Sequence, residues 1–279
     1  MANRALVLGG GGVTGVAWEL GILAGLADAG LDLTGADLVV GTSAGAVVAA
    51  QITTGTDLAA LYERQLAGPG AEIAAKIGPG FLLRWLLVVR AARTAETVGA
   101  RLGRLALRAD TVSEAERRAV IAARLPVHEW PGRRLLITAV DAGSGEFAAF
   151  DRDSGVPLVD AVAASCAVPG VWPAVSINGR RWIDGGVHSP ANADLAAGCD
   201  RVVVLAPAPY GFGPVTGVAA QVARLRTRAL VVAVSPDRAA RRAIGRNVLD
   251  PARRADAARA GRAQAAAVGP AVSEVWSGD

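Results

Sequence analysis

A serine stands between two glycines at the end of a predicted strand. Residues 41–45 read Gly-Thr-Ser-Ala-Gly, so Gly41, Ser43 and Gly45 fit the pattern G-x-S-x-G. In this pattern the chain turns sharply, the serine hydroxyl projects above a sheet, and a helix begins beneath it. Small residues also suit an ordinary strand-to-helix turn, so the pentapeptide alone leaves both interpretations open. Ser43 is therefore a candidate nucleophile whose partners must lie elsewhere in the chain.

A second glycine-rich turn precedes the serine. Residues 9–12 are all glycine, and Gly10, Gly12 and Gly15 fit the G-x-G-x-x-G fingerprint of dinucleotide-binding proteins. The same turn could instead point bare N–H groups at a developing oxyanion, helped by the positive end of the next helix. A dinucleotide fold would end its second strand with an acidic residue for the ribose, whereas this chain ends it at the serine turn. We therefore favour the oxyanion interpretation.

A serine hydroxyl is a weak nucleophile until a base takes its proton. Asp184 follows a predicted hairpin strand and precedes Gly185 and Gly186. An Asp-Gly pair is otherwise typical of a plain turn, but burial in an apolar cleft would raise the pKa of the Asp184 carboxyl and make it a better base. A Ser43–His188–Asp184 triad is the alternative, although Asp and His only four residues apart would normally share one turn.

The predicted elements bring these motifs to one edge of a sheet. Residues 5–8 and 38–40 are short apolar runs, typical of strands buried on both faces, and each runs into one of the glycine turns. Open parallel sheets bind ligands at the carboxyl ends of their strands. An Asn-Gly pair at 178–179 predicts a hairpin that leads to Asp184. We predict an α/β fold, a three-layer α/β/α sandwich with a mainly parallel central sheet.

Residues 57–124 are predicted to be helical, as a cap-like insertion within one domain that spans residues 1–279. The segment 81–89 is apolar on nearly every face of a helix, which favours a core or cap helix over a lipid-facing lid. At nine residues it is far shorter than the roughly 20 that a bilayer span requires.

The composition excludes several classes of protein. Of the 279 residues 52% are hydrophobic and 19% charged, which excludes a disordered chain. Two cysteines are too few for a disulfide framework or a structural zinc site, and no acidic cluster has calcium-ligand spacing, so we expect no metal and no cofactor. The basic residues behind the net charge of +4 are spread along the chain, which argues against a nucleic-acid partner. We expect a soluble cytoplasmic protein, with peripheral membrane contact left open and no oligomeric state predicted.

The glycine-rich turn, the G-x-S-x-G turn and the Asp-Gly-Gly turn, in this order, resemble the patatin-like phospholipase family. Residues 164–170 resemble the S-x-A-x-P segment of that family, and residues 181–187 resemble the approach to its catalytic aspartate. The resemblance covers nearly the whole chain and implies an acyl hydrolase with a Ser-Asp dyad. By this resemblance Ser43 is the nucleophile and Asp184 accepts its proton. The N–H groups around the oxyanion are then those of Gly10, Gly11 and Gly12.

The family resemblance implies hydrolysis of acyl esters of phospholipids or other lipids through an acyl-serine intermediate. The sequence departs from the family pattern at Thr14, where many members carry Arg or Lys, and at Asn192, which follows Pro190 where the family often has Asn before Pro. An acyltransferase of related fold, a dinucleotide-binding protein and a catalytically idle scaffold are the alternatives. The substrate we expect is a lipid or another ester.

Overall fold

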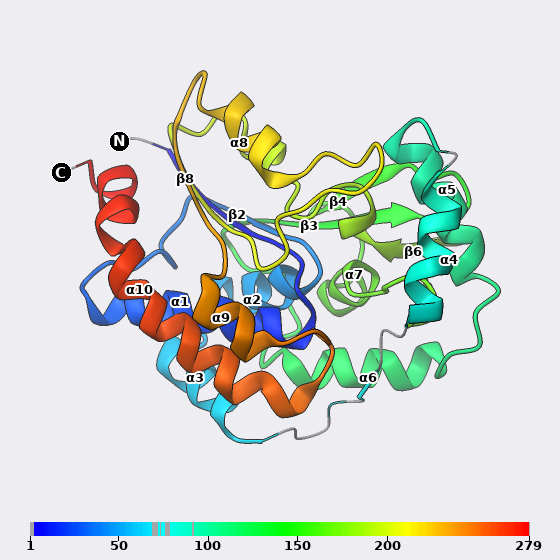
Figure 1. The fold of residues 1–279 in the computed structure, drawn as a ribbon, viewed down its shortest axis with the longest axis horizontal. Helices are drawn as coiled ribbons and strands as arrows, with labels where there is room; N and C mark the ends of the chain where they lie inside the picture. The colour runs from blue at the N-terminus through cyan, green and yellow to red at the C-terminus, as the bar shows by residue number, and fades with distance from the viewer. Residues whose placement is uncertain (1–2, 69–71, 73, 76–78, 91, 279) are drawn as a thin grey trace.

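One eight-stranded sheet forms the centre of the molecule (Figure 1). The computed structural model describes residues 3–68, 72, 74–75, 79–90 and 92–278. The strands are β1 (Arg4–Leu8), β2 (Leu38–Gly41), β3 (Arg134–Asp141), β4 (Phe147–Phe150), β5 (Val175–Ile177), β6 (Arg180–Asp184), β7 (Arg201–Leu205) and β8 (Leu230–Val234). Their order is β5-β6-β3-β2-β1-β7-β8, with β4 paired to β3. The neighbouring strands β3, β2, β1, β7 and β8 run parallel to one another. Strands β4 and β6 pair antiparallel with β3, and β5 pairs antiparallel with β6.

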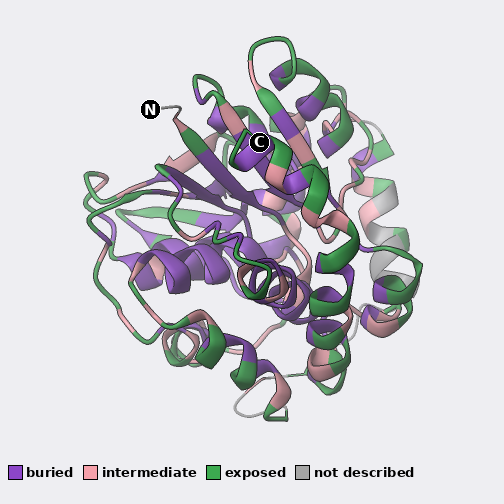
Figure 2. Cartoon of the chain, turned by 90° about the vertical axis from the view of Figure 1, so that its left-hand side faces the viewer, coloured by how far each residue is buried: buried purple, intermediate pink, exposed green. Residues whose placement is uncertain are grey.

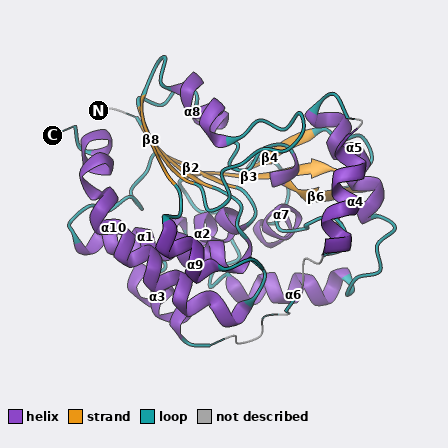
Figure 3. Cartoon of the chain, in the orientation of Figure 1, coloured by secondary structure: helices purple, strands orange, loops and turns teal. Residues whose placement is uncertain are grey.

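Helices flank this sheet, which confirms the predicted mixed α/β fold (Figure 3). They are α1 (Gly12–Asp28), α2 (Ala44–Thr53), α3 (Leu58–Leu66), α4 (Pro79–Arg90), α5 (Ala95–Ala106), α6 (Glu114–Arg124), α7 (Leu158–Ser165), α8 (Val218–Leu225), α9 (Arg238–Ile244) and α10 (Arg254–Trp276). Helices α1, α2 and α7 lie against one face, with α3, α9 and α10 outside them, and α8 lies on the other face (Figure 1). Residues 57–124 hold α3 to α6, and none of the residues described in this stretch lies in a strand.

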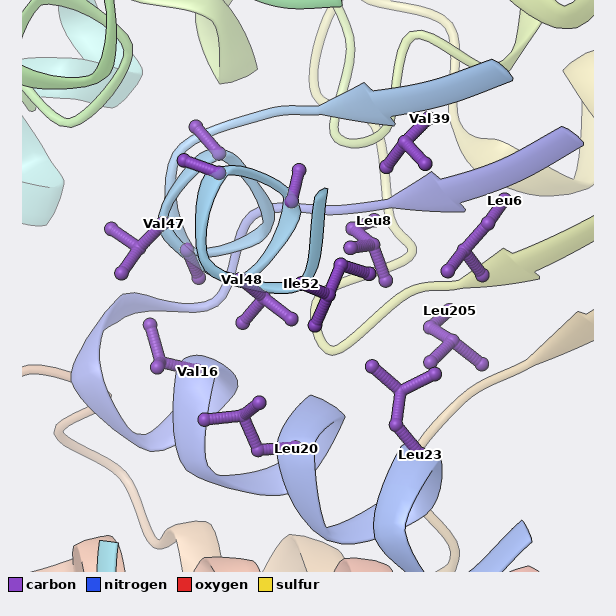
Figure 4. Packing of buried hydrophobic residues seen from close by; sticks show 14 of the residues in the cluster. Leu6, Leu8, Val16, Leu20, Leu23, Val39, Val47, Val48, Ile52 and Leu205 are labelled. Atoms are coloured by element: carbon purple, nitrogen blue, oxygen red, sulfur yellow. The ribbon is translucent and has the colours of Figure 1, made fainter. Parts of the chain in front are cut away.

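The central strands β1, β2 and β7 are apolar apart from the arginines that begin β1 and β7, because both of their faces are covered. Along β1, Leu6 and Leu8 point toward α1 and α2, whereas Ala5 and Val7 belong to a second cluster on the α8 side. Figure 4 shows the first cluster, in which Leu205 of β7 lies opposite Leu23 of α1, and Val48 of α2 points toward Leu20 of α1. Burial is accordingly concentrated in the sheet and in the helix faces turned toward it (Figure 2). This double burial accounts for the continuous apolar runs in the sequence.

Helix α10 packs along α1 at very short range. A Cβ atom at Gly21 would lie 2.2 Å from the Ala258 carbonyl oxygen, and one at Gly261 would lie 2.4 Å from the Trp18 carbonyl oxygen. The indole Nε1 of Trp18 donates a hydrogen bond to Gln264 Oε1 at 3.0 Å. Glycines on both helices therefore let the two backbones approach, and α10 holds the helix that follows the glycine-rich turn.

Helix α4 lies at the surface instead of in the core. Leu83 and Leu87, one turn apart, are 56% and 58% exposed, whereas Val89 is buried and Trp85 Nε1 donates to the Pro169 carbonyl at 3.3 Å. The sequence favoured a core or cap helix, and the exposure of Leu83 and Leu87 shows that the described side chains of this helix are not all buried. The side chains of residues 81, 82, 84 and 86 lie outside those that the structure describes. Within the described chain, no helix has the length and apolarity to cross a membrane.

Candidate active site

Ser43 occupies a strained turn between β2 and α2. Its backbone angles are φ 54° and ψ −113°, in the left-handed half of the map that a residue with a Cβ rarely enters. The Ser43 N–H donates to Ser165 Oγ at 2.9 Å, and Cys166 Sγ donates to the Ser43 carbonyl at 3.2 Å. Residues at the end of α7 thus bind both the N–H and the carbonyl group of the strained residue.

The glycines of the serine turn are required by close contacts with β1 at Gly45 and with α2 at Gly41. A Cβ atom at Gly45 would lie 2.1 Å from the Leu8 carbonyl oxygen, and one at Gly41 would lie 2.6 Å from Ala46 Cα. The Gly45 N–H donates to the Gly9 carbonyl at 3.0 Å. The serine turn and the glycine-rich turn are therefore bonded to each other at the carboxyl ends of adjacent strands.

Asp184 ends β6 and faces the serine. Its side chain is buried, with 5% of the residue exposed, and it accepts a hydrogen bond from the Gly186 N–H at 2.7 Å. The Ser43 side chain lies close enough to interact with the carboxyl. Burial raises the pKa of the Asp184 carboxyl from 3.8 to about 7, against the opposing effects of the Gly186 N–H and the Ser43 side chain. The structure thus brings the two predicted residues together, with a carboxylate poised to accept a proton near neutral pH.

Asn192 links the serine turn to the aspartate turn. Its Nδ2 lies within hydrogen-bond distance of Thr42 Oγ1 at 3.0 Å and of the Gly185 carbonyl at 3.3 Å. Gly185 itself packs directly on β3, since a Cβ there would lie 2.2 Å from Thr138 Oγ1. Thr138 Oγ1 also donates to Thr42 Oγ1 at 2.9 Å. This buried network fixes the distance between the two turns.

His188 belongs to this network and not to the serine. Its Nδ1 lies 2.8 Å from Asn192 Oδ1, and its ring stacks on Phe147 with centroids 4.2 Å apart. Among the described residues it has no hydrogen bond to Ser43 or Asp184. The histidine of the alternative triad therefore has its hydrogen bond with Asn192 and not with Ser43 or Asp184.

The glycine-rich turn lies against Ser43 but offers fewer N–H groups than predicted. A Cβ at Gly10 would lie 3.6 Å from Ser43 Cβ. The Gly10 N–H, however, donates to the Pro190 carbonyl at 2.8 Å, so the expectation that it serves the oxyanion is corrected. The N–H groups of Gly11 and Gly12 have no hydrogen-bond acceptor among the described residues. These two remain the candidate oxyanion donors.

Other parts of the chain pack tightly on the same turn. A pyrophosphate must come up against the backbone of such a turn and the first amides of its helix. Here a Cβ at Gly11 would lie 2.4 Å from Pro207 Cβ, and one at Gly12 would lie 2.5 Å from the Val248 carbonyl oxygen. That carbonyl also accepts the Thr14 N–H at 3.2 Å, so one of the first amides of the helix already has an acceptor. These contacts disfavour the dinucleotide interpretation.

A small cavity opens beside Ser43. Its volume is about 20 Å³, and its lining includes Val16, Arg117, Cys166 and Trp172. A larger cavity of about 260 Å³ adjoins it and shares Val13, Val16 and Arg124 with it. Among the residues described, no group of three His, Cys, Asp or Glu side chains is placed to hold a metal ion.

Three residues of the site were not assigned a role by sequence reasoning. Ser165 lies in the segment that resembles S-x-A-x-P, so a signal for it existed. Asn192 differs from the family pattern in that it follows Pro190 in the sequence instead of preceding it. In the structure its side chain links the serine turn to the aspartate turn. Arg117 carries no local signal, because one arginine in an amphipathic helix is typical of a solvated face.

Comparison with known proteins agrees with this geometry. The family model for patatin-like phospholipases matches residues 6–197. A comparison with curated proteins finds no match. The crystal structure of VipD from Legionella pneumophila is similar with a TM-score of 0.50 and 14% identity, over 97% of this chain and 67% of that one. The type III effector protein ExoU gives 0.45 and 17%, over 98% of this chain and 53% of that one, so this chain spans about half of its length. The likeness to VipD supports the fold.

Proposed function

This chain belongs to the patatin-like phospholipase family, and we propose that it is a lipid acyl hydrolase with Ser43 as its nucleophile and Asp184 as its base. The observation that carries the proposal is the position of the Ser43 side chain beside the buried Asp184 carboxyl, close enough to lower its pKa. A nucleophile next to a base, in a strained turn beside free backbone amides, forms a machinery for acyl transfer.

In the first half of the proposed reaction, Ser43 Oγ bonds to the ester carbonyl carbon while its proton passes to Asp184. The carbonyl π electrons move to oxygen, and the N–H groups of Gly11 and Gly12 hold the negative charge there. The tetrahedral intermediate then collapses and breaks the ester C–O bond. The leaving alcohol takes the proton from Asp184, and the acyl group stays on Ser43.

In the second half, water takes the place of the alcohol. Asp184 accepts a proton from the water as its oxygen attacks the acyl carbon, and the bond to Ser43 Oγ breaks. The serine recovers its proton and the free acid leaves. A carboxyl group with a pKa of about 7 suits both halves, because it gains and loses a proton at neutral pH with little driving force either way.

We further propose that the protein meets lipid from the surface of a membrane. Leu83 and Leu87 expose an apolar face on α4, and the same helix is tied through Trp85 to Pro169, next to residues that line the Ser43 cavity. An exposed leucine pair on a helix beside the site suits contact with the acyl region of a bilayer.

The test is ester hydrolysis by the wild type and by the variants Ser43→Ala, Asp184→Asn and His188→Ala, with fluorophosphonate labelling of the serine. We expect the first two variants to lose kcat by about a thousandfold or more, and His188→Ala to keep most of it. Loss in His188→Ala would indicate a triad. Absence of labelling at Ser43 would contradict the proposal, and acyl transfer to a carrier without release of free acid would identify a transacylase.

A further inference from the structure

Arg117 is a buried arginine that the protein itself does not pair. It lies on α6 with 4% of its surface exposed, and its Nε and Nη1 are sealed from solvent with no hydrogen-bond partner. None of its guanidinium nitrogens donates to a described residue, and no carboxylate among the described residues forms an ion pair with it. Its Cζ stacks 3.9 Å from the ring centroid of Trp172. The aromatic contact holds the guanidinium in place but does not neutralise its charge.

The polar groups near Arg117 are either paired with each other or uncharged. Arg124 lines the same cavity, but its charge is paired with Glu72. Arg124 donates hydrogen bonds to the Glu72 carboxylate from Nε at 2.9 Å and from Nη2 at 2.5 Å. Cys166 stays a neutral thiol, since burial raises its pKa to about 12. Burial and the charge of Arg124 lower the pKa of Arg117 to about 10, which still leaves it charged at neutral pH. Arg117 therefore carries a positive charge with which no described carboxylate forms an ion pair.

The position of this charge connects it with the proposed chemistry. Arg117 and Ser43 line the same cavity of about 20 Å³. A space of this size holds about one water molecule or one oxygen atom. Keeping an unpaired charge in such a place is costly for folding, so an anionic group that binds there recovers interaction energy that the free protein lacks.

We propose that Arg117 forms an anion-binding subsite that takes an oxygen of a phosphate group on the substrate, so that the protein prefers phosphate-bearing acyl esters to neutral ones. The inference rests on the proposed function, because it assumes that the ester is presented to Ser43. A guanidinium group binds phosphate oxygens through charge-assisted hydrogen bonds, and unfilled donors in a water-poor cavity make such bonds strong. Arg117 then determines specificity without taking part in bond breaking.

The experiment compares two soluble substrates with the same acyl chains, dihexanoylphosphatidylcholine and dihexanoylglycerol, both below the concentration at which they aggregate. The ratio of kcat/KM for the first to kcat/KM for the second is measured in the wild type, in Arg117→Met and in Arg118→Met. We expect the ratio to fall roughly tenfold to a hundredfold in Arg117→Met, the worth of a charge-assisted hydrogen bond. Arg118→Met is the matched control, because Arg118 is the next residue of α6, is 48% exposed in its side chain, and pairs with Asp160.

A second measurement separates binding from turnover. In the Ser43→Ala background, calorimetry gives the Kd for dihexanoylphosphatidylcholine with and without Arg117→Met, and we expect about a tenfold weakening or more. Arg117→Lys, which keeps the charge, should recover part of the affinity. If the wild type hydrolyses neither substrate, the proposed function fails while this measurement still decides the subsite.

The inference is overturned by an unchanged substrate ratio or by equal losses on both substrates in folded protein. Inhibition by hexanoate, the acid product, is measured in the same variants. The inference is also overturned if weaker inhibition by hexanoate is the only effect of Arg117→Met, because the subsite would then bind the acid product. Thermal unfolding of each variant identifies any that has failed to fold.

Discussion

At the scale of single residues, burial gives Asp184 its proposed role and also limits the pH range of that role. The carboxyl must be ionised to accept the Ser43 proton, and its pKa is about 7. We therefore expect kcat/KM on a soluble ester to rise about tenfold per pH unit below pH 7 and to level off above it. His188→Ala should keep the same inflection. A profile that is flat from pH 5 to pH 8 would contradict the assignment of Asp184 as the base.

The same burial makes Asp184 costly for stability. Its pKa in the folded protein lies above that in the unfolded chain, so unfolding is favoured as pH rises, with no effect below about pH 4 and the full effect above about pH 7. A shift from 3.8 to about 7 corresponds to about 4 kcal/mol of unfolding free energy. We expect Asp184→Asn to raise Tm at pH 8 and to leave it nearly unchanged at pH 4. Asp110→Asn, at an exposed position, is the control, and an equal change at both pH values would refute the linkage.

The residues that meet through long-range contacts were the hardest to predict. Ser43 and Asp184 each stand next to glycines in a recognisable turn, so the family resemblance implied the partnership that we propose. The Gly10 N–H was predicted to be free, and only the fold places the Pro190 carbonyl against it. Likewise, nothing near Arg117 in the sequence distinguishes it from the exposed Arg118, because burial depends on how α6 packs on Trp172.

At the scale of elements, α4 carries a prediction about lipid surfaces. Replacing Leu83 and Leu87 together by glutamate puts two charges on the exposed apolar face, and each charge is unfavourable at a membrane interface. We expect activity on phospholipid vesicles to fall about tenfold or more, while activity on monomeric substrate stays within about twofold.

The matched control for this double variant is Leu107→Glu. Leu107 follows α5 and is 48% exposed, so it gives a similar change of charge away from α4. Equal losses on vesicles and on monomers, or an effect of the same size in the control, would show that α4 does not contact lipid.

The elements themselves were largely predictable where local chemistry defines them. The Asn-Gly pair at 178–179 joins β5 to β6, as the hairpin signal indicated. The pairing of β6 with β3 was not predictable, because its register brings Asp184 opposite Ala139 through contacts between distant segments. For α4 the sequence indicated a helix, but it did not indicate which side of that helix packs on the rest of the protein.

At the scale of the whole molecule, the part of the chain beyond the family match completes the fold. The match ends at residue 197, yet β7 pairs with β1, and α10 packs on α1 through Gly261. We expect Gly261→Ala to lower the free energy of unfolding by about 2 kcal/mol or more, because a methyl group would meet the Trp18 carbonyl at 2.4 Å. Urea denaturation measures the change.

Gly269→Ala is the matched control on the same helix. Its Cβ would meet nothing closer than Leu26 Cδ2 at 4.0 Å, so the higher helix propensity of alanine should leave stability unchanged or raise it by up to about 1 kcal/mol. Equal destabilisation by both substitutions would show that close packing of α10 on α1 is not what these glycines provide.

The anchors of the glycine-rich turn have a consequence for how the protein is made. The Leu205 and Pro190 carbonyls accept the N–H groups of Gly9 and Gly10, and the Val248 carbonyl accepts the N–H of Thr14 in the helix that follows. All three carbonyls lie far downstream of the serine. A ribosome therefore polymerises the nucleophile early and supplies the last of these anchors only near the end of translation. We therefore expect the proposed activity to begin only once synthesis has passed Val248.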